Sequence, residues 1–166
     1  MSGDELIDEA RKHEKKIMNF FLQSGLPYHE AEDLMQEVYL RLWRYRSKYV
    51  ETAKLSTFLY LIARQVQIDA LRANTRRDCR EKIWGGGGEE VQAPASMARM
   101  DVLWALSRLP EGMREVVVLG VMQDMPYAEI AEILGIPVGT VKSRMFNALR
   151  KLKEIFDEQG LGGNGK

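Results

Sequence analysis

Basic side chains gather in one short stretch near the end of the sequence. Five of them lie between positions 142 and 153, and this stretch has no acidic residue. Ammonium and guanidinium groups neutralise phosphates, a guanidinium can pair with guanine, and a carboxamide can pair with adenine. The side chains that we expect to contact DNA are those of Thr140, Lys142, Ser143, Arg144, Phe146, Asn147 and Arg150. Two alternatives stay open: a solvated cationic face without a partner, and a core position for Phe146.

A rigid helix must present these side chains, and residues 127–153 predict one. Their spacing is that of a helix-turn-helix. Ala131 is small where two helices approach closely, Gly135 allows the positive φ of a tight turn, and Val141 fills the angle between the helices. We expect Thr140 to cap the second helix. A basic second helix in this motif is typical of proteins that bind the major groove.

Composition limits the other possibilities. The 166 residues carry 24 basic and 24 acidic side chains, so any binding of nucleic acid must come from local patches. The single cysteine, Cys79, excludes an internal disulfide and a cysteine-built zinc site, and His13 and His29 are isolated. The N-terminus is polar and acidic, and the apolar run 116–122 is too short to cross a bilayer. We therefore expect a cytoplasmic protein with no cofactor, no metal and no direct membrane insertion.

Enzymatic activity is not expected. The sequence has no metal cluster and no pairing of a nucleophile with a base. The glycine run 85–88 is not followed by the Lys-Ser/Thr pair and the helix that a phosphate-binding loop requires. We expect no catalytic residue and no small-molecule substrate.

Nearly all of the remaining sequence predicts helix. Apolar residues recur at helical spacing over 6–23, from 28 to 49 and over 57–74, and then from 97 and over 114–122. We expect Ser56 or Thr57 to cap the third of these helices. The expected apolar stripe of the second is Leu34, Val38, Leu42 and Tyr45, and that of the third includes Phe58, Leu61, Ile62, Ile68 and Leu71.

Composition changes between residues 74 and 98, where the four glycines exclude a packed core or a regular helix. The sequence therefore predicts an all-α protein of two small helical domains joined by a flexible linker. The predicted bounds are 1–75 for the first domain, 76–97 for the linker, 98–156 for the second domain and 157–166 for a disordered tail.

The chain resembles a bacterial extracytoplasmic-function (ECF) sigma factor, the two-domain specificity subunit of RNA polymerase. The resemblance covers roughly residues 9–152. It rests on AEDLMQEVYLRLW and STFLYLIARQVQIDALR in the first half, and on LSRLPEGMREVVVLGVMQDMPYAEIAEILGIPVGTVKSRM in the second. It implies a region 2 helical bundle, a region 4 helix-turn-helix, and a non-enzymatic protein that directs core RNA polymerase to promoters.

The resemblance also implies roles for residues of the first domain. A helix there docks on the coiled-coil clamp of the largest polymerase subunit, through Asp33, Gln36, Glu37 and Arg41. Without the family, an ordinary well-capped surface helix is the better explanation of these residues. The connector and the helix after it bind the −10 element and open the duplex. The residues implied are Tyr49, Lys54, Ser56, Thr57, Tyr60, Arg64, Gln65, Arg72 and Arg76, although several are also consistent with solvated polar positions. The family commonly has asparagine where this chain has Gln65.

For the second domain, the resemblance implies binding of the −35 element and of the flap of the second-largest polymerase subunit. It further implies control by an anti-sigma factor. Two other functions stay open. One is a helix-turn-helix regulator that acts without polymerase, and the other is a sigma mimic that only sequesters regulators.

Overall fold

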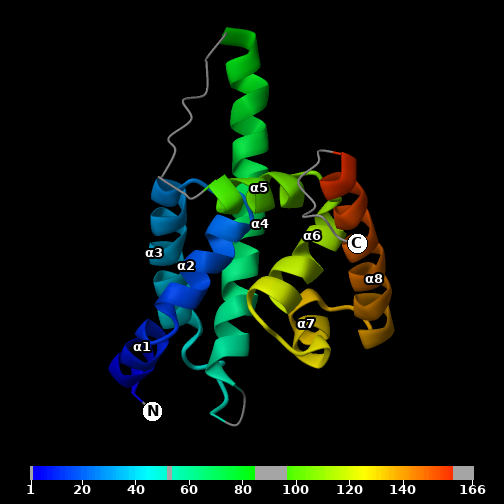
Figure 1. Ribbon diagram of the computed structural model, residues 1–166. Coiled ribbons are helices and arrows are strands. Elements are labelled where there is room, and N and C mark those ends of the chain that lie inside the picture. The colour runs from blue at the N-terminus through cyan, green and yellow to red at the C-terminus, as the bar shows by residue number, and fades with distance from the viewer. Residues whose placement is uncertain (1, 52–53, 85–96, 159–166) are drawn as a thin grey trace. The chain divides into compact units, whose positions relative to one another are not determined.

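The computed structural model describes residues 2–51, 54–84 and 97–158, and for 74–84 and 97–100 it describes the backbone alone. Helices are the regular elements of these residues, as the sequence predicted (Figure 1). None of the described helices is both long and apolar enough to cross a membrane. The chain divides into two compact units. The predicted glycine linker at 85–88 and most of the predicted tail lie outside the described residues.

The first unit contains α1 (Gly3–Arg11), α2 (Glu14–Gln23), α3 (Tyr28–Tyr45) and α4 (Leu55–Trp84). The single helix predicted over 6–23 is wrong, because the chain forms two. At the end of α1 the N–H groups of positions 12 and 13 donate to carbonyls three residues back, which tightens and closes the helix. The sequence has no glycine or proline at this break, so the break could not be predicted from it.

Helix α4 differs from the prediction at both ends. It begins at Leu55, so Ser56 and Thr57 lie inside its first turn and neither caps it. It also continues to Trp84, which places the start of the predicted linker, 76–97, inside a helix.

The core of the first unit lies between α3 and α4, and α1 packs against both. Its buried apolar residues on these three helices are Leu6, Ala10, Ala31, Met35, Val38, Leu42, Leu55, Leu59, Tyr60, Ile62, Ala63 and Val66. The predicted stripe of α4 is partly wrong, because Leu61 and Leu71 are exposed. The buried face instead follows the positions of Leu55, Leu59 and Val66, and Tyr45 of α3 is exposed as well.

The second unit contains α5 (Met97–Ser107), α6 (Glu111–Val117), the π-helix η1 (Val118–Met122), α7 (Tyr127–Leu134) and α8 (Val138–Glu158). The helix predicted over 114–122 therefore starts earlier and ends in a π-helical turn. Helix α8 contacts α5, α6 and α7 and forms the centre of the packing.

Arg114 closes the C-terminal end of α5. Its Nε donates to the carbonyl of Leu106 at 2.9 Å, and its Nη2 donates to those of Ser107 at 3.2 Å and Leu109 at 2.8 Å. The last carbonyls of a helix have no N–H partner within the helix, and a cation suits the negative end of the helix dipole. One guanidinium thus ties α5, the turn after it and α6 together.

The turn between α7 and α8 depends on Gly135, whose φ is +68°. We expect Gly135→Ala to lower the free energy of unfolding by about 1 kcal/mol, because a Cβ is disfavoured in the left-handed conformation. Gly139→Ala is the matched control. A Cβ would meet no atom within 4 Å at either position, but Gly139 lies in the first turn of α8 without a positive φ. Alanine there should raise stability by about 0.5 kcal/mol. Urea denaturation of both variants measures these changes. Equal changes in the free energy of unfolding would contradict the role assigned to the positive φ of Gly135.

Candidate nucleic-acid interface

The helix-turn-helix predicted from the sequence is present in the second unit. Helix α7 ends at the left-handed Gly135, and α8 packs against α7. Ala131 is buried between them, and Val141 and Ile130 are completely buried. The packing prediction is confirmed, and it leaves one side of α8 turned outward.

The outward side of α8 carries the predicted DNA-contacting residues. Lys142, Ser143, Phe146 and Arg150 are exposed, and Thr140, Arg144 and Asn147 are half-buried. Phe146 is 67% exposed, so a core position for this ring is excluded. The guanidinium of Arg150 lies 6.0 Å from the centre of the ring of Phe146. The Oγ of Ser143 donates to the carbonyl of Gly139 at 3.0 Å within the helix.

The cap predicted at Thr140 is wrong. Helix α8 begins at Val138, and the N–H groups of Thr140 and Val141 both donate to the carbonyl of Pro137, at 3.0 and 3.1 Å. Proline can supply this acceptor although it has no N–H of its own. Thr140 is therefore part of the first turn of the helix.

The guanidinium of Arg144 contacts another helix of the second unit. A Cβ placed on Gly112 would lie 3.3 Å from its Nη1 and 3.4 Å from its Cζ, so the guanidinium rests against the first turn of α6. This contact orients the side chain from a neighbouring helix. It also means that Arg144 has a packing role in addition to any contact with DNA.

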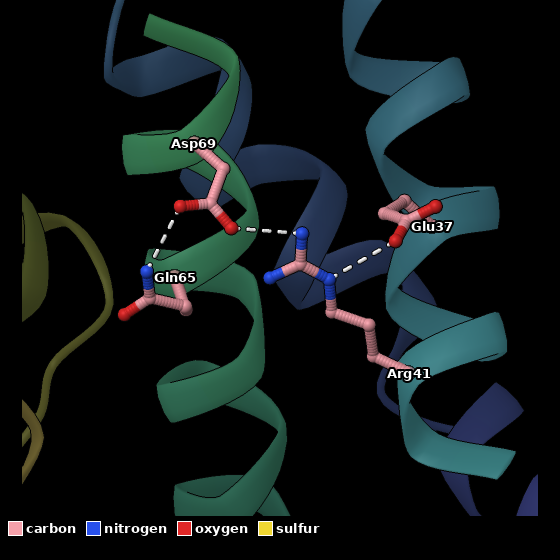
Figure 2. Close-up of polar contacts among 4 residues, drawn as sticks. All are labelled: Glu37, Arg41, Gln65 and Asp69. Atoms are coloured by element: carbon pink, nitrogen blue, oxygen red, sulfur yellow. Dashed lines mark hydrogen bonds and ion pairs between the residues drawn. The ribbon is translucent and has the colours of Figure 1, made fainter. Parts of the chain in front are cut away.

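In the first unit, four polar side chains join α3 to α4 (Figure 2). On α3, the Nε of Arg41 donates to Oε1 of Glu37 at 3.0 Å. Across the helix pair, Nη2 of Arg41 lies 2.8 Å from Oδ2 of Asp69. On α4, Nε2 of Gln65 donates to Oδ1 of Asp69 at 3.0 Å.

A single cation lies at the centre of this network. The side chain of Arg41 is only 18% exposed and lies between two carboxylates. The hydrogen bond from Arg41 lowers the pKa of Asp69, and the hydrogen bond from Gln65 acts in the same direction. Sequence reasoning assigned Glu37 and Arg41 to polymerase and Gln65 to DNA, whereas the structure places all three in one chain of polar contacts. No sequence signal links them, since α3 and α4 are separate in the chain.

The other predicted polymerase contacts, Asp33 and Gln36, are exposed on α3. The same helix exposes two large apolar side chains, Leu40 at 54% and Trp43 at 43%. Exposed aromatic and aliphatic side chains on one helix are typical of a surface that binds another protein.

The residues predicted to bind the −10 element have unequal positions. Lys54, Gln65 and Arg72 are exposed; Tyr49, Ser56 and Arg64 are half-buried; and the side chain of Arg76 lies outside those described. Tyr60 is 4% exposed, with its ring edge-on to Phe20 at 5.7 Å, and Thr57 is 6% exposed. Their burial corrects the expectation that they face a DNA strand, since both belong to the core.

A cavity of about 290 Å³ lies beside the connector between α3 and α4. Its lining residues are Ser2, Gly3, Leu6, Arg46, Ser47, Tyr49 and Glu51. Of the residues that the resemblance implies for binding the −10 element, only Tyr49 lines this cavity. The contribution of α1 was missed, because only tertiary packing brings the N-terminal helix to the end of α3.

Two family models match the chain. Sigma-70 region 2 matches residues 6–77 and sigma-70 region 4 matches residues 99–152. These bounds lie close to the two predicted helical domains.

Individual relatives agree with the family models. The chain is 32% identical over 137 residues to the ECF RNA polymerase sigma factor SigL of Mycobacterium tuberculosis, covering 80% of this chain and 77% of that protein. It is 29% identical over 143 residues to the ECF RNA polymerase sigma factor RpoE of Cereibacter sphaeroides, covering 84% and 79%. The solved sigma factor RpoE from Bartonella quintana, in complex with the anti-sigma factor NepR, has the same fold at 24% identity, with a TM-score of 0.78 over 90% of this chain and 97% of that one. The chain belongs to the ECF family of RNA polymerase sigma factors.

Proposed function

We propose that this sigma factor binds core RNA polymerase and recognises the −35 element by placing α8 in the major groove. The observation that supports this proposal most directly is the outward face of α8. This face has cations, amide and hydroxyl donors, and no acidic residue lies between positions 138 and 153. Cations at the rim bind phosphates, and Arg144 and Asn147 have the chemistry to pair with base edges. The overall charge is zero, so this local face must supply the attraction to DNA.

The first unit has the features needed for the other half of promoter recognition. Its proposed contact with the clamp of the largest polymerase subunit is the exposed face of α3, with Asp33 and Gln36 beside Leu40 and Trp43. The proposed −10 surface is the connector with its cavity, together with the exposed polar side chains of α4. Opening a duplex requires that unstacked bases be held, and a cavity next to an aromatic side chain suits that task. The protein would act in the cytoplasm, where polymerase meets the chromosome.

Reconstituted transcription tests this proposal. Purified chain and active core RNA polymerase are incubated with genomic promoter fragments, and transcripts are mapped. We expect specific start sites that require the chain. If core polymerase initiates equally without it, the proposal fails. Tight promoter binding by the chain alone would instead favour a regulator that acts without polymerase.

We further propose that an anti-sigma factor controls this protein. Support comes from the Bartonella quintana sigma factor, which was solved with its anti-sigma factor NepR, and from the apolar side chains that α8 exposes, Phe146 and Leu149. A protein that copurifies with the chain from its own cells should abolish transcription in the reconstituted assay. Unchanged transcription at saturating amounts of that protein would contradict such a role.

A further inference from the structure

We propose that Gly112 is a positioning residue for recognition of the −35 element. Because it has no side chain, the guanidinium of Arg144 can lie flat against α6 and hold its donor edge toward promoter DNA. The inference rests on the proposed function, in which α8 enters the major groove at the −35 element. It adds to that function a residue on a different helix, which acts through Arg144.

The guanidinium of Arg144 meets α6 with its flat face. A Cβ added to Gly112 would lie 3.3 Å from Nη1, 3.4 Å from Cζ and 3.7 Å from Nε. Three atoms bonded in one plane are almost equally distant from a neighbouring point only when that point lies above the plane. A side chain at position 112 would therefore press on the face of the guanidinium and force it to move.

The packed face leaves the donors of Arg144 free. All N–H groups of a guanidinium lie in its plane, so a contact with one face blocks none of them. Arg144 is half-buried, yet within the described residues it has no hydrogen bond or ion pair. Arg41 and Arg114, which also join helices, have carboxylate or carbonyl acceptors. A fixed guanidinium with free donors suits two adjacent acceptors, and a guanine edge and a phosphate both offer these.

Prior packing makes this arginine a better ligand for DNA. A mobile arginine side chain loses rotamer freedom when it pairs with DNA, and a side chain that is already held loses less. The contact with α6 also sets the direction of the donor edge. A side chain at position 112 would remove both advantages while the charge of Arg144 remains. We therefore expect weaker binding of the −35 element without the loss of any cation.

The experiment measures the affinity of holoenzyme, assembled from the full chain and core polymerase, for a duplex promoter probe on which the wild type initiates. Gly112 lies in α6 without a positive φ, so its replacement introduces no backbone strain. Gly112→Ala should weaken binding about twofold, and Gly112→Val, with two methyl groups against the guanidinium, about fivefold. On a probe with a scrambled −35 element, both variants should bind as the wild type does.

A double-mutant cycle separates positioning from a general effect on folding. In the Arg144→Ala background, Gly112→Val should change the affinity by less than about twofold, because the group that it displaces is gone. In the Arg150→Ala background it should keep its full effect, since Arg150 is a cation of the same helix that is not among the atoms nearest to position 112. Equal losses from Gly112→Val in all three backgrounds overturn the inference, as does wild-type affinity in Gly112→Val itself.

Modified probes identify the acceptor that Arg144 binds. Replacement of a guanine by 7-deazaguanine removes its N7, and a methylphosphonate removes the charge of one phosphate; each is placed in turn along the −35 element. At one position the modification should weaken the wild type about fivefold and Arg144→Ala by less than about twofold. If no position shows this pattern, Arg144 does not bind DNA and the inference fails. If scrambling the −35 element leaves the affinity of the wild type unchanged, the proposed function fails as well.

Discussion

Initiation at a promoter with an intact −35 element is expected to fall about tenfold or more in the Arg144→Ala variant. A guanidinium that pairs with a guanine edge contributes discrimination of about 1 to 3 kcal/mol, and alanine removes it entirely. The measurement is multiple-round transcription by reconstituted holoenzyme on two templates, one with the natural −35 element and one with that element scrambled. The loss should be confined to the natural template, and binding to core polymerase should be unchanged.

The contact of Arg144 with Gly112 makes a stability control necessary. Thermal unfolding of the variant should show a change well below that of a core substitution, because the guanidinium is half-exposed. Arg108→Ala is the matched variant. It also removes an arginine from the second unit, but one that is exposed directly after α5, beside Trp104. Equal losses on both templates, or weaker binding to core polymerase, would show that Arg144 is structural.

Arg114→Ala is expected to have the largest effect on stability, lowering the free energy of unfolding by about 2 to 3 kcal/mol. The substitution leaves three carbonyl groups, those of Leu106, Ser107 and Leu109, without their charged donor. Two of these contacts are partly buried, so water replaces the lost hydrogen bonds poorly. The measurement is urea denaturation of the full chain, in which unfolding is monitored by a spectroscopic signal from the second unit.

Two further variants separate the hydrogen bonds from the charge. Arg114→Lys keeps the cation at the end of α5 but cannot reach three acceptors at once, so it should recover only part of the loss. Arg108→Ala removes an exposed arginine of the same unit and should cost within about 0.5 kcal/mol. If Arg114→Ala lowers the free energy of unfolding no more than Arg108→Ala does, Arg114 does not stabilise the end of α5.

Local sequence alone determined the helix-turn-helix. Ala131, Gly135 and Val141 each satisfy a requirement of backbone geometry or close approach that few residue types can meet, and their order along the chain is enough to specify the motif. The structure adds the conformation of Gly135 and the burial of Val141 without changing the prediction. The exposed face of α8 follows directly, because a helix with one side packed must turn the other outward.

Whether a given residue of α4 is buried or exposed was harder to predict from the sequence. Helix α4 has apolar residues on more than one face, so periodicity alone did not identify the buried one, and Tyr60 was assigned to DNA although it packs against Phe20. An aromatic ring with a hydroxyl suits both a core and a binding surface. Only tertiary packing against α4, including that of Phe20 from α2, resolves this ambiguity.

The sequence by itself determined the helical class, the helix-turn-helix and the cationic face, because each follows from residues within one or two helical turns. Tertiary structure alone decided the network from Glu37 through Arg41 and Asp69 to Gln65, the closure of α5 by Arg114, and the contribution of α1 to the cavity beside Tyr49. Side chains from separate helices meet in all three. Their meeting depends on how whole helices pack, and no short stretch of sequence specifies that.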